Sequence, residues 1–104
     1  MTSFDNRETA FENKYAHDED VRFKVTNRRN KLLGLWAAER LGKTDAAAYA
    51  KEVVLADFAE AGDDDVLQKV LGDLKAAGVE ITAEEIRTKM TALVTEAKHQ
   101  IMTE

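Results

Sequence analysis

The sequence contains no cysteine and no proline, and only five of its 104 residues are glycine. Without cysteine, the chain can form neither disulfide bonds nor a metal site held by thiolates. Proline and glycine are the residues that disfavour helices most strongly, so their scarcity favours helices throughout. A chain of this length can bury one modest hydrophobic core. We therefore expect an all-α protein with one folded domain.

Long apolar runs and the residues of common catalytic centres are also missing. No apolar run approaches the roughly 20 residues that cross a bilayer, and no charged-then-apolar leader begins the chain. The only serine is Ser3, no glycine-rich elbow is present, and the two histidines, His17 and His99, lie far apart. We expect a cytoplasmic protein without direct membrane insertion, without a metal site and without enzymatic activity.

Charge is distributed unevenly along the chain. The formal net charge is −5, yet residues 21–43 contain seven basic residues and one acidic residue. The segments on both sides, residues 1–20 and 44–104, contain more acids than bases. The basic segment predicts either a polyanionic partner or an electrostatic complement to the acidic segments that fold against it.

Four stretches have the apolar spacing of amphipathic helices, at about residues 20–41, 45–61, 64–77 and 83–102. Gly42, Gly62 and Gly78 follow the first three stretches, where glycine commonly ends a helix in the left-handed conformation. Because connections of a few residues make neighbouring helices roughly antiparallel, the pattern predicts a small four-helix bundle. We assign residues 20–104 to this bundle.

Two threonines stand where helices would begin. Thr82 is predicted to be an N-cap with Glu85 as its capping-box partner, and Thr44 is predicted to cap the helix that follows Gly42. The triplet Gly42-Lys43-Thr44 also matches the end of a phosphate-binding loop, but the leading glycine of that motif is replaced by Ala37. Helix ending and helix capping therefore explain the triplet.

The opening residues, 1–19, have helix signals but few apolar side chains. At about 100° per residue, Phe4, Phe11 and Tyr15 point in nearly the same direction, away from the apolar stripe of the first bundle helix. A short helix with so sparse an apolar face is marginal in water, so we expect this segment to be mobile in the free protein. Three aligned aromatic residues predict binding in a groove of another protein, and an ordinary frayed terminus is the alternative.

The stretch "NRRNKLLGLWAAERLG" combines bases with a tryptophan. Arg28 and Arg29 could form a site for one nucleotide together with Trp36 or Tyr49, although we interpret Trp36 first as a core residue. Nucleic acid is not expected as a partner, because the twenty acidic residues of the chain would repel a polyanion.

Several long stretches resemble one known family. They are "FDNRETAFENKYAHDED" (residues 4–20), "RRNKLLGLWAAERLG" (28–42), "EVVLADFAEAGDDDVLQKVLGDLKAAGV" (52–79) and "IRTKM" (86–90). Together they are similar to the zeta subunit of alphaproteobacterial F-type ATP synthases, the small ATPase inhibitor protein of that enzyme. The resemblance implies a four-helix bundle preceded by an inhibitory segment.

In this family the segment enters a catalytic interface between the alpha and beta subunits, next to gamma, and stops rotation in the hydrolysing direction while sparing synthesis. The resemblance therefore implies a regulator that is not an enzyme, on the ATP synthase head at the inner membrane. It requires no cofactor, although weak adenine-nucleotide binding to the bundle is implied. We expect a monomer when free. A small adenine-nucleotide-binding sensor using Arg28, Arg29 and Trp36 is the alternative.

Twelve residues match the family's inhibitory segment by position. They are Phe4, Asp5, Arg7, Glu8, Ala10, Phe11, Glu12, Lys14, Tyr15, Ala16, His17 and Asp18.

Overall fold

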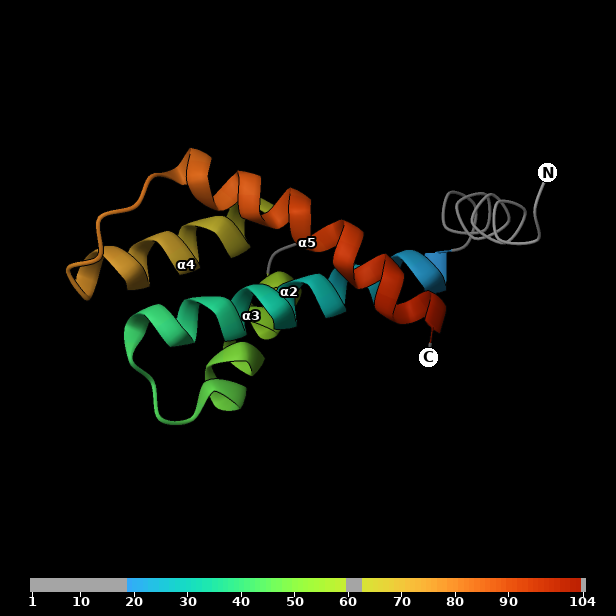
Figure 1. The fold of residues 1–104 in the computed structure, drawn as a ribbon, viewed down its shortest axis with the longest axis horizontal. Helices are drawn as coiled ribbons and strands as arrows, with labels where there is room; N and C mark the ends of the chain where they lie inside the picture. The colour runs from blue at the N-terminus through green and yellow to red at the C-terminus, as the bar shows by residue number, and fades with distance from the viewer. Residues whose placement is uncertain (1–18, 60–62, 104) are drawn as a thin grey trace.

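The computed structural model describes residues 19–59 and 63–103, with the side chains of residues 58 and 59 left aside. These residues form four α-helices and contain no strand (Figure 1). The helices are α2 (Glu19–Leu41), α3 (Ala46–Ala59), α4 (Asp63–Ala76) and α5 (Ala83–Thr103). The predicted all-α four-helix architecture is confirmed. Each helix boundary that lies within these residues is within one residue of the predicted one, and the predicted end of the second helix, near residue 61, lies outside them.

Local signals explain where the helices end. Gly42 and Gly78 have φ angles of 70° and 81°, the left-handed conformation that glycine adopts without strain, as predicted. The predicted stop at Gly62 lies outside the described residues. Thr82 is an N-cap as expected, because its Oγ1 accepts a hydrogen bond from the Glu85 N–H at 3.1 Å.

The predicted cap at Thr44 is wrong. Asp45 caps α3 instead, since its Oδ1 accepts a hydrogen bond from the Ala48 N–H at 3.0 Å. An N-cap side chain reaches the amide two or three residues ahead, and Asp45 directly precedes the first helical residue, Ala46. Thr44 is one residue too early for this contact.

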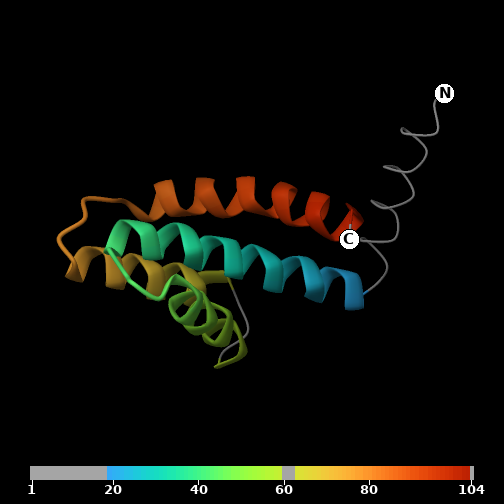
Figure 2. The ribbon, with the colours of Figure 1, turned by 60° about the horizontal axis from the view of Figure 1, so that its bottom comes forward.

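Helix α2 is the centre of the bundle and packs against all three other helices. Its first residues and the last residues of α5 lie at the same end of the molecule, so these two helices are antiparallel (Figures 1 and 2). Figure 2 shows α2, α4 and α5 running roughly along one direction, whereas α3 is turned out of it. The two helices approach closely at Gly34 of α2, which has no side chain and lies against Ala50 of α3.

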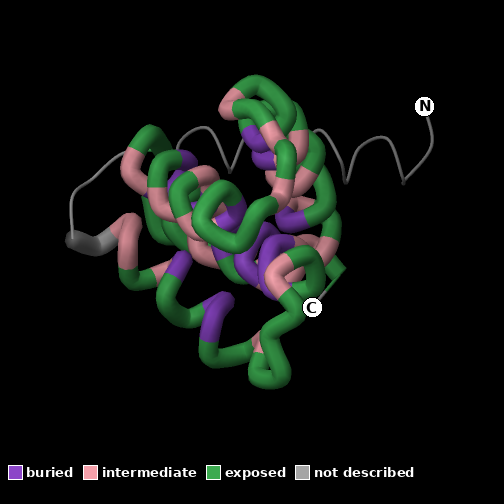
Figure 3. The backbone as a smooth tube through the Cα atoms, turned by 90° about the vertical axis from the view of Figure 1, so that its left-hand side faces the viewer, coloured by how far each residue is buried: buried purple, intermediate pink, exposed green. Residues whose placement is uncertain are grey.

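The hydrophobic core is contributed by all four helices and lies between them (Figure 3). Its fully buried residues include Leu33 of α2, Val53 of α3, Leu74 of α4 and Ile86 of α5. Trp36 packs against this core but is only partly buried. None of the described helices has the length and apolar character that crossing a membrane requires.

Candidate functional site

The twelve residues matched to the inhibitory segment, from Phe4 to Asp18, lie outside the described residues. Their role and the mobility of this segment therefore stay predictions. The described chain begins at Glu19, the first residue of α2, directly after this segment. The bundle contains three groups of polar and aromatic side chains that bear on function.

The first group joins α2 to the start of α4. Arg29 is only 5% exposed, and its Nε and Nη2 both donate hydrogen bonds to the Asn30 Oδ1, at 3.0 and 2.7 Å. Nη2 also donates to the Asp63 Oδ1 at 2.9 Å and forms an ion pair with it. A buried guanidinium needs such partners to offset its lost hydration. Arg29 is therefore already engaged in holding the bundle together.

Arg28 points toward a different helix. Its Nη1 donates a hydrogen bond to the Gln100 Oε1 of α5 at 2.8 Å. The two neighbouring arginines thus bind different elements, α5 for Arg28 and α4 for Arg29. Adjacent residues on a helix are about 100° apart, which explains the divergence.

The second group surrounds Trp36. The guanidinium carbon of Arg40 lies 4.7 Å from the centre of the tryptophan ring, and the Lys89 Nζ lies 5.8 Å from it. Both distances are within the range of cation–π attraction. Trp36, Arg40 and Lys89 line one pocket together with Glu80 and Glu85, whereas Arg29 lines another pocket. The structure therefore does not bring Arg29 and Trp36 to the same pocket.

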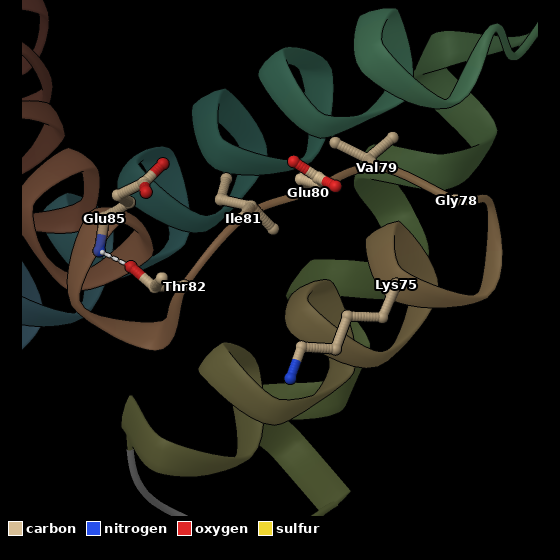
Figure 4. A pocket seen from close by; sticks show the side chains of 7 residues that line it. All are labelled: Lys75, Gly78, Val79, Glu80, Ile81, Thr82 and Glu85. Carbon is tan, nitrogen blue, oxygen red and sulfur yellow. Dashed lines mark hydrogen bonds between the residues drawn. The ribbon is translucent and has the colours of Figure 1, made fainter.

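A neighbouring pocket lies between the end of α4 and the start of α5. Figure 4 shows Lys75, Ile81 and the hydrogen-bonded pair Thr82 and Glu85 around it. Glu80 and Ile81 line both this pocket and the Trp36 pocket. The connection between α4 and α5 thus contributes to the lining of both pockets.

The third group surrounds Tyr49, which the sequence suggested as a possible neighbour of Arg28 and Arg29 but which lines a pocket with Lys43, Glu52 and Asp73 instead. Tyr49 is 3% exposed, and its hydroxyl donates a hydrogen bond to the Asp73 Oδ2 at 2.7 Å. The Lys69 Nζ contacts the same oxygen at 3.0 Å and the Glu52 Oε1 at 3.5 Å. The available signal was the pair Lys69 and Asp73, four residues apart on α4. These contacts join α3 to α4.

In this third group, the pKa values of Tyr49 and Asp73 are shifted further from neutral pH. Burial, the hydrogen bond to Asp73 and nearby negative charge raise the pKa of Tyr49. Burial alone would raise the pKa of Asp73, but hydrogen bonds from Tyr49 and Lys69 outweigh it and hold that pKa below its ordinary value. General acid–base catalysis needs a pKa near the working pH. This network is therefore better suited to structure than to proton transfer.

The fold and these groups define a small all-α protein whose described polar groups mainly hold helices together. The chain belongs to the ATPase inhibitor subunit zeta family, because the family model with that description matches residues 1–100. The family is thus one of inhibitory subunits of an ATPase. No curated protein matches the chain.

Proposed function

We propose that the chain inhibits ATP hydrolysis by the F-type ATP synthase by inserting its N-terminal segment at an alpha/beta catalytic interface next to gamma. The observation that carries this proposal is the family match over residues 1–100, which includes both the segment and the bundle. The same proposal gives the protein three partner subunits, alpha, beta and gamma. It is a monomer when free and is located on the ATP synthase head at the inner membrane.

The segment has the chemistry of a groove-binding helix. Phe4, Phe11 and Tyr15 share one direction at about 100° per residue, and charged residues flank them. Burial of aromatic side chains dominates the free energy of many protein interfaces. A helix of 18 residues is about 27 Å long, which is enough to reach from a subunit surface toward a buried rotor.

The bundle supports this proposal as the scaffold of the segment. Its polar side chains connect different helices, as Arg29 of α2 does with Asp63 of α4 and Tyr49 of α3 does with Asp73 of α4. Helix α2, which directly follows the segment, contacts all three other helices. A segment attached to this central helix is attached to the most firmly packed element of the bundle.

Replacing Phe11 and Tyr15 together with alanine tests the proposal. Loss of two buried aromatic contacts should raise the concentration needed for half-inhibition of the purified ATP synthase head by at least about tenfold. The melting temperature should be unchanged, because neither residue belongs to the bundle. Leu55→Ala is a matched control, since Leu55 is a bundle residue that is 53% exposed. The control should inhibit like the wild type, and unchanged inhibition by the double variant would defeat the proposal.

The place of insertion needs a separate measurement. A photoreactive phenylalanine analogue at Phe11 should form cross-links to alpha, beta or gamma in the inhibited enzyme. The same analogue at Leu55, on the exposed face of α3, should form few or none. Cross-links from Leu55 alone would contradict insertion of the segment.

A weak adenine-nucleotide site on the bundle is a second proposal, supported by the Trp36 group. An aromatic ring with Arg40 and Lys89 close to it offers both stacking and positive charge. Titration with ADP should change Trp36 fluorescence, and Arg40→Ala with Lys89→Ala should weaken that change. If Arg28→Ala and Arg29→Lys weaken it instead, the site is the one expected from the sequence.

A further inference from the structure

The start of α2 and the end of α5 form a part of the bundle that consists of two helices. We call this part the two-helix arm and define it as residues 19–28 of α2 and 97–103 of α5. Figures 1 and 2 show these two ends extending together beyond α3 and α4. Asp63, the first residue of α4, is bonded to Arg29, so α4 reaches α2 just beyond the arm. The two helices of the arm therefore depend mainly on each other for packing.

The arm buries little apolar surface. Val25 and Ala97 are the only residues of the arm that are buried, and neither belongs to the hydrophobic core shared by the four helices. In α2 that core begins at Leu33, and in α5 it ends at Met90 with Leu93 packed against it. The free energy that holds helices together grows with the apolar surface that they bury. The arm is therefore held more weakly than the rest of the bundle.

A layer of polar side chains lies at the base of the arm, where the hydrophobic core ends: Asn27, Arg29 and Asn30. Asn30 is fully buried, and its Nδ2 has no hydrogen-bond partner among the residues that the structure describes. The Oδ1 of Asn27 is also buried and lacks a partner within the same part of the chain. Such atoms have lost their bonds to water, which raises the free energy of the closed arm. Opening restores this hydration.

We propose that the two-helix arm opens as a unit while the four-helix core stays folded, and that this opening lets the start of α2 change direction when the N-terminal segment binds the ATP synthase. The opening is a property of the free protein, whereas its use in inhibition rests on the proposed function. Parts of a protein that bury few apolar contacts open at a lower free energy than the whole molecule unfolds.

The place of the arm in the chain gives the opening its role. The arm directly follows the N-terminal segment, because Glu19 is the first residue of α2. While the arm is closed, packing on α5 fixes the direction of the first turns of α2. Ten helical residues are marginal on their own in water, so the open arm can bend or unwind. The core holds α2 from Leu33 onward, and the segment can thus be reoriented without unfolding the bundle.

Hydrogen exchange on the full free chain tests the opening. Amides of residues 23–28 and 98–102 should exchange at similar protection, and at least about 100-fold faster than those of residues 33–38. Gly72→Ala, a change in α4 that meets no atom within 4 Å, should slow exchange in residues 33–38 by about threefold and leave the arm unchanged. Equal slowing in both regions would show that the arm opens only when the whole bundle unfolds, which would overturn the proposal.

Asn27→Leu tests the contribution of the polar layer. Leucine has nearly the shape of asparagine and no polar atom to leave unpaired, and the Asn27 side chain makes no hydrogen bond that the change could break within the described residues. Exchange of the amides of residues 23–28 should therefore become about tenfold slower. Unchanged or faster exchange in a variant with wild-type circular dichroism would contradict this cause of opening.

A cleavable tether tests the use of the opening in inhibition. The Arg28 Nη1 donates a hydrogen bond to the Gln100 Oε1 at 2.8 Å, so cysteines at these two positions can be joined by a short bis-maleimide that contains a disulfide. The chain has no cysteine of its own. The tethered protein should inhibit the purified ATP synthase head at least about tenfold more slowly than the same protein after reductive cleavage.

A tether between Asp64→Cys and Arg87→Cys is the matched control. These side chains also form a contact of 2.8 Å, and it joins α4 to α5 within the four-helix part. Tethered and cleaved forms of the control should inhibit at equal rates. Equal rates for the arm tether, or equal slowing by both tethers, would overturn the use of the arm. The effect of altering Phe11 and Tyr15 decides the proposed function independently, and hydrogen exchange decides the opening without the enzyme.

Discussion

At the scale of the residue, Tyr49 is buried in the core, yet its hydroxyl has a charged partner. The hydrogen bond to Asp73 spans 2.7 Å and joins α3 to α4. Hydrogen bonds to a charged acceptor contribute more to stability than bonds between neutral groups. Tyr49→Phe keeps the ring and removes only this bond. We expect it to lower the free energy of unfolding at pH 7 by about 1–2 kcal/mol, as measured by urea denaturation.

The same residue makes stability depend on alkaline pH. The folded state raises the pKa of Tyr49 above its ordinary value of 10.0, so the unfolded chain loses this proton first. The stabilising contribution is complete below pH 10.0 and decreases as pH rises above it. Lys69, whose pKa is raised by Asp73 and Glu52 in spite of the opposing effect of burial, acts in the same direction. Tyr49→Phe should show a shallower loss of stability above pH 10 in urea titrations, and an unchanged slope would contradict this assignment.

At the scale of the element, the approach of α3 to α2 depends on a missing side chain. A Cβ on Gly34 would lie 2.5 Å from the Ala50 Cα and 3.3 Å from the Val53 Cβ. Because backbone atoms cannot rotate away, the two helices would have to separate. We expect Gly34→Ala to destabilise the protein by about 3 kcal/mol, at the upper end of the cost of overpacking a core.

Gly72 is the matched control for this change. It lies in the interior of α4, and a Cβ there would meet no atom within 4 Å. Alanine is a better helix former than glycine, so Gly72→Ala should stabilise by about 0.5–1 kcal/mol. Thermal denaturation of both variants measures the difference. Equal effects of the two substitutions would mean that the close contact at Gly34 is unimportant.

The helices themselves could be predicted because their signals are local. The apolar spacing and the glycines at positions 42 and 78 are patterns of one or two helical turns. The observed helix bounds and the positive φ angles of both glycines agree with them. The error at Thr44 arose because threonine and aspartate are both good caps and stand next to each other. Burial of Tyr49 was not foreseen, since the alanine-rich sequence of α3 does not distinguish one face clearly.

Contacts between distant elements could not be predicted in this way. Arg28, Arg29 and Trp36 are close in sequence, but Arg28 contacts α5, Arg29 contacts α4, and Trp36 lines a separate pocket. Which helix each side chain meets depends on how the bundle closes, and no short-range pattern encodes it. The residues expected to form the inhibitory segment were identified by family resemblance, and their contacts stay predictions.

At the scale of the whole molecule, the account divides the chain into a bundle and a segment with different tasks. The bundle has one core shared by four helices, and its polar groups connect α2 with α4, α2 with α5 and α3 with α4. The segment precedes α2 and has aromatic residues but little apolar surface for the bundle to bury. In this account, the free energy of binding comes mainly from the segment.

Deletion of residues 2–18 is the most direct test of this division. The account predicts that the shortened protein keeps its helical circular dichroism and melts cooperatively, because α2 to α5 contain the core. It also predicts that the shortened protein no longer inhibits ATP hydrolysis by the purified ATP synthase head at any concentration that inhibits with the full chain. Full inhibition by the folded, shortened protein would contradict the central claim.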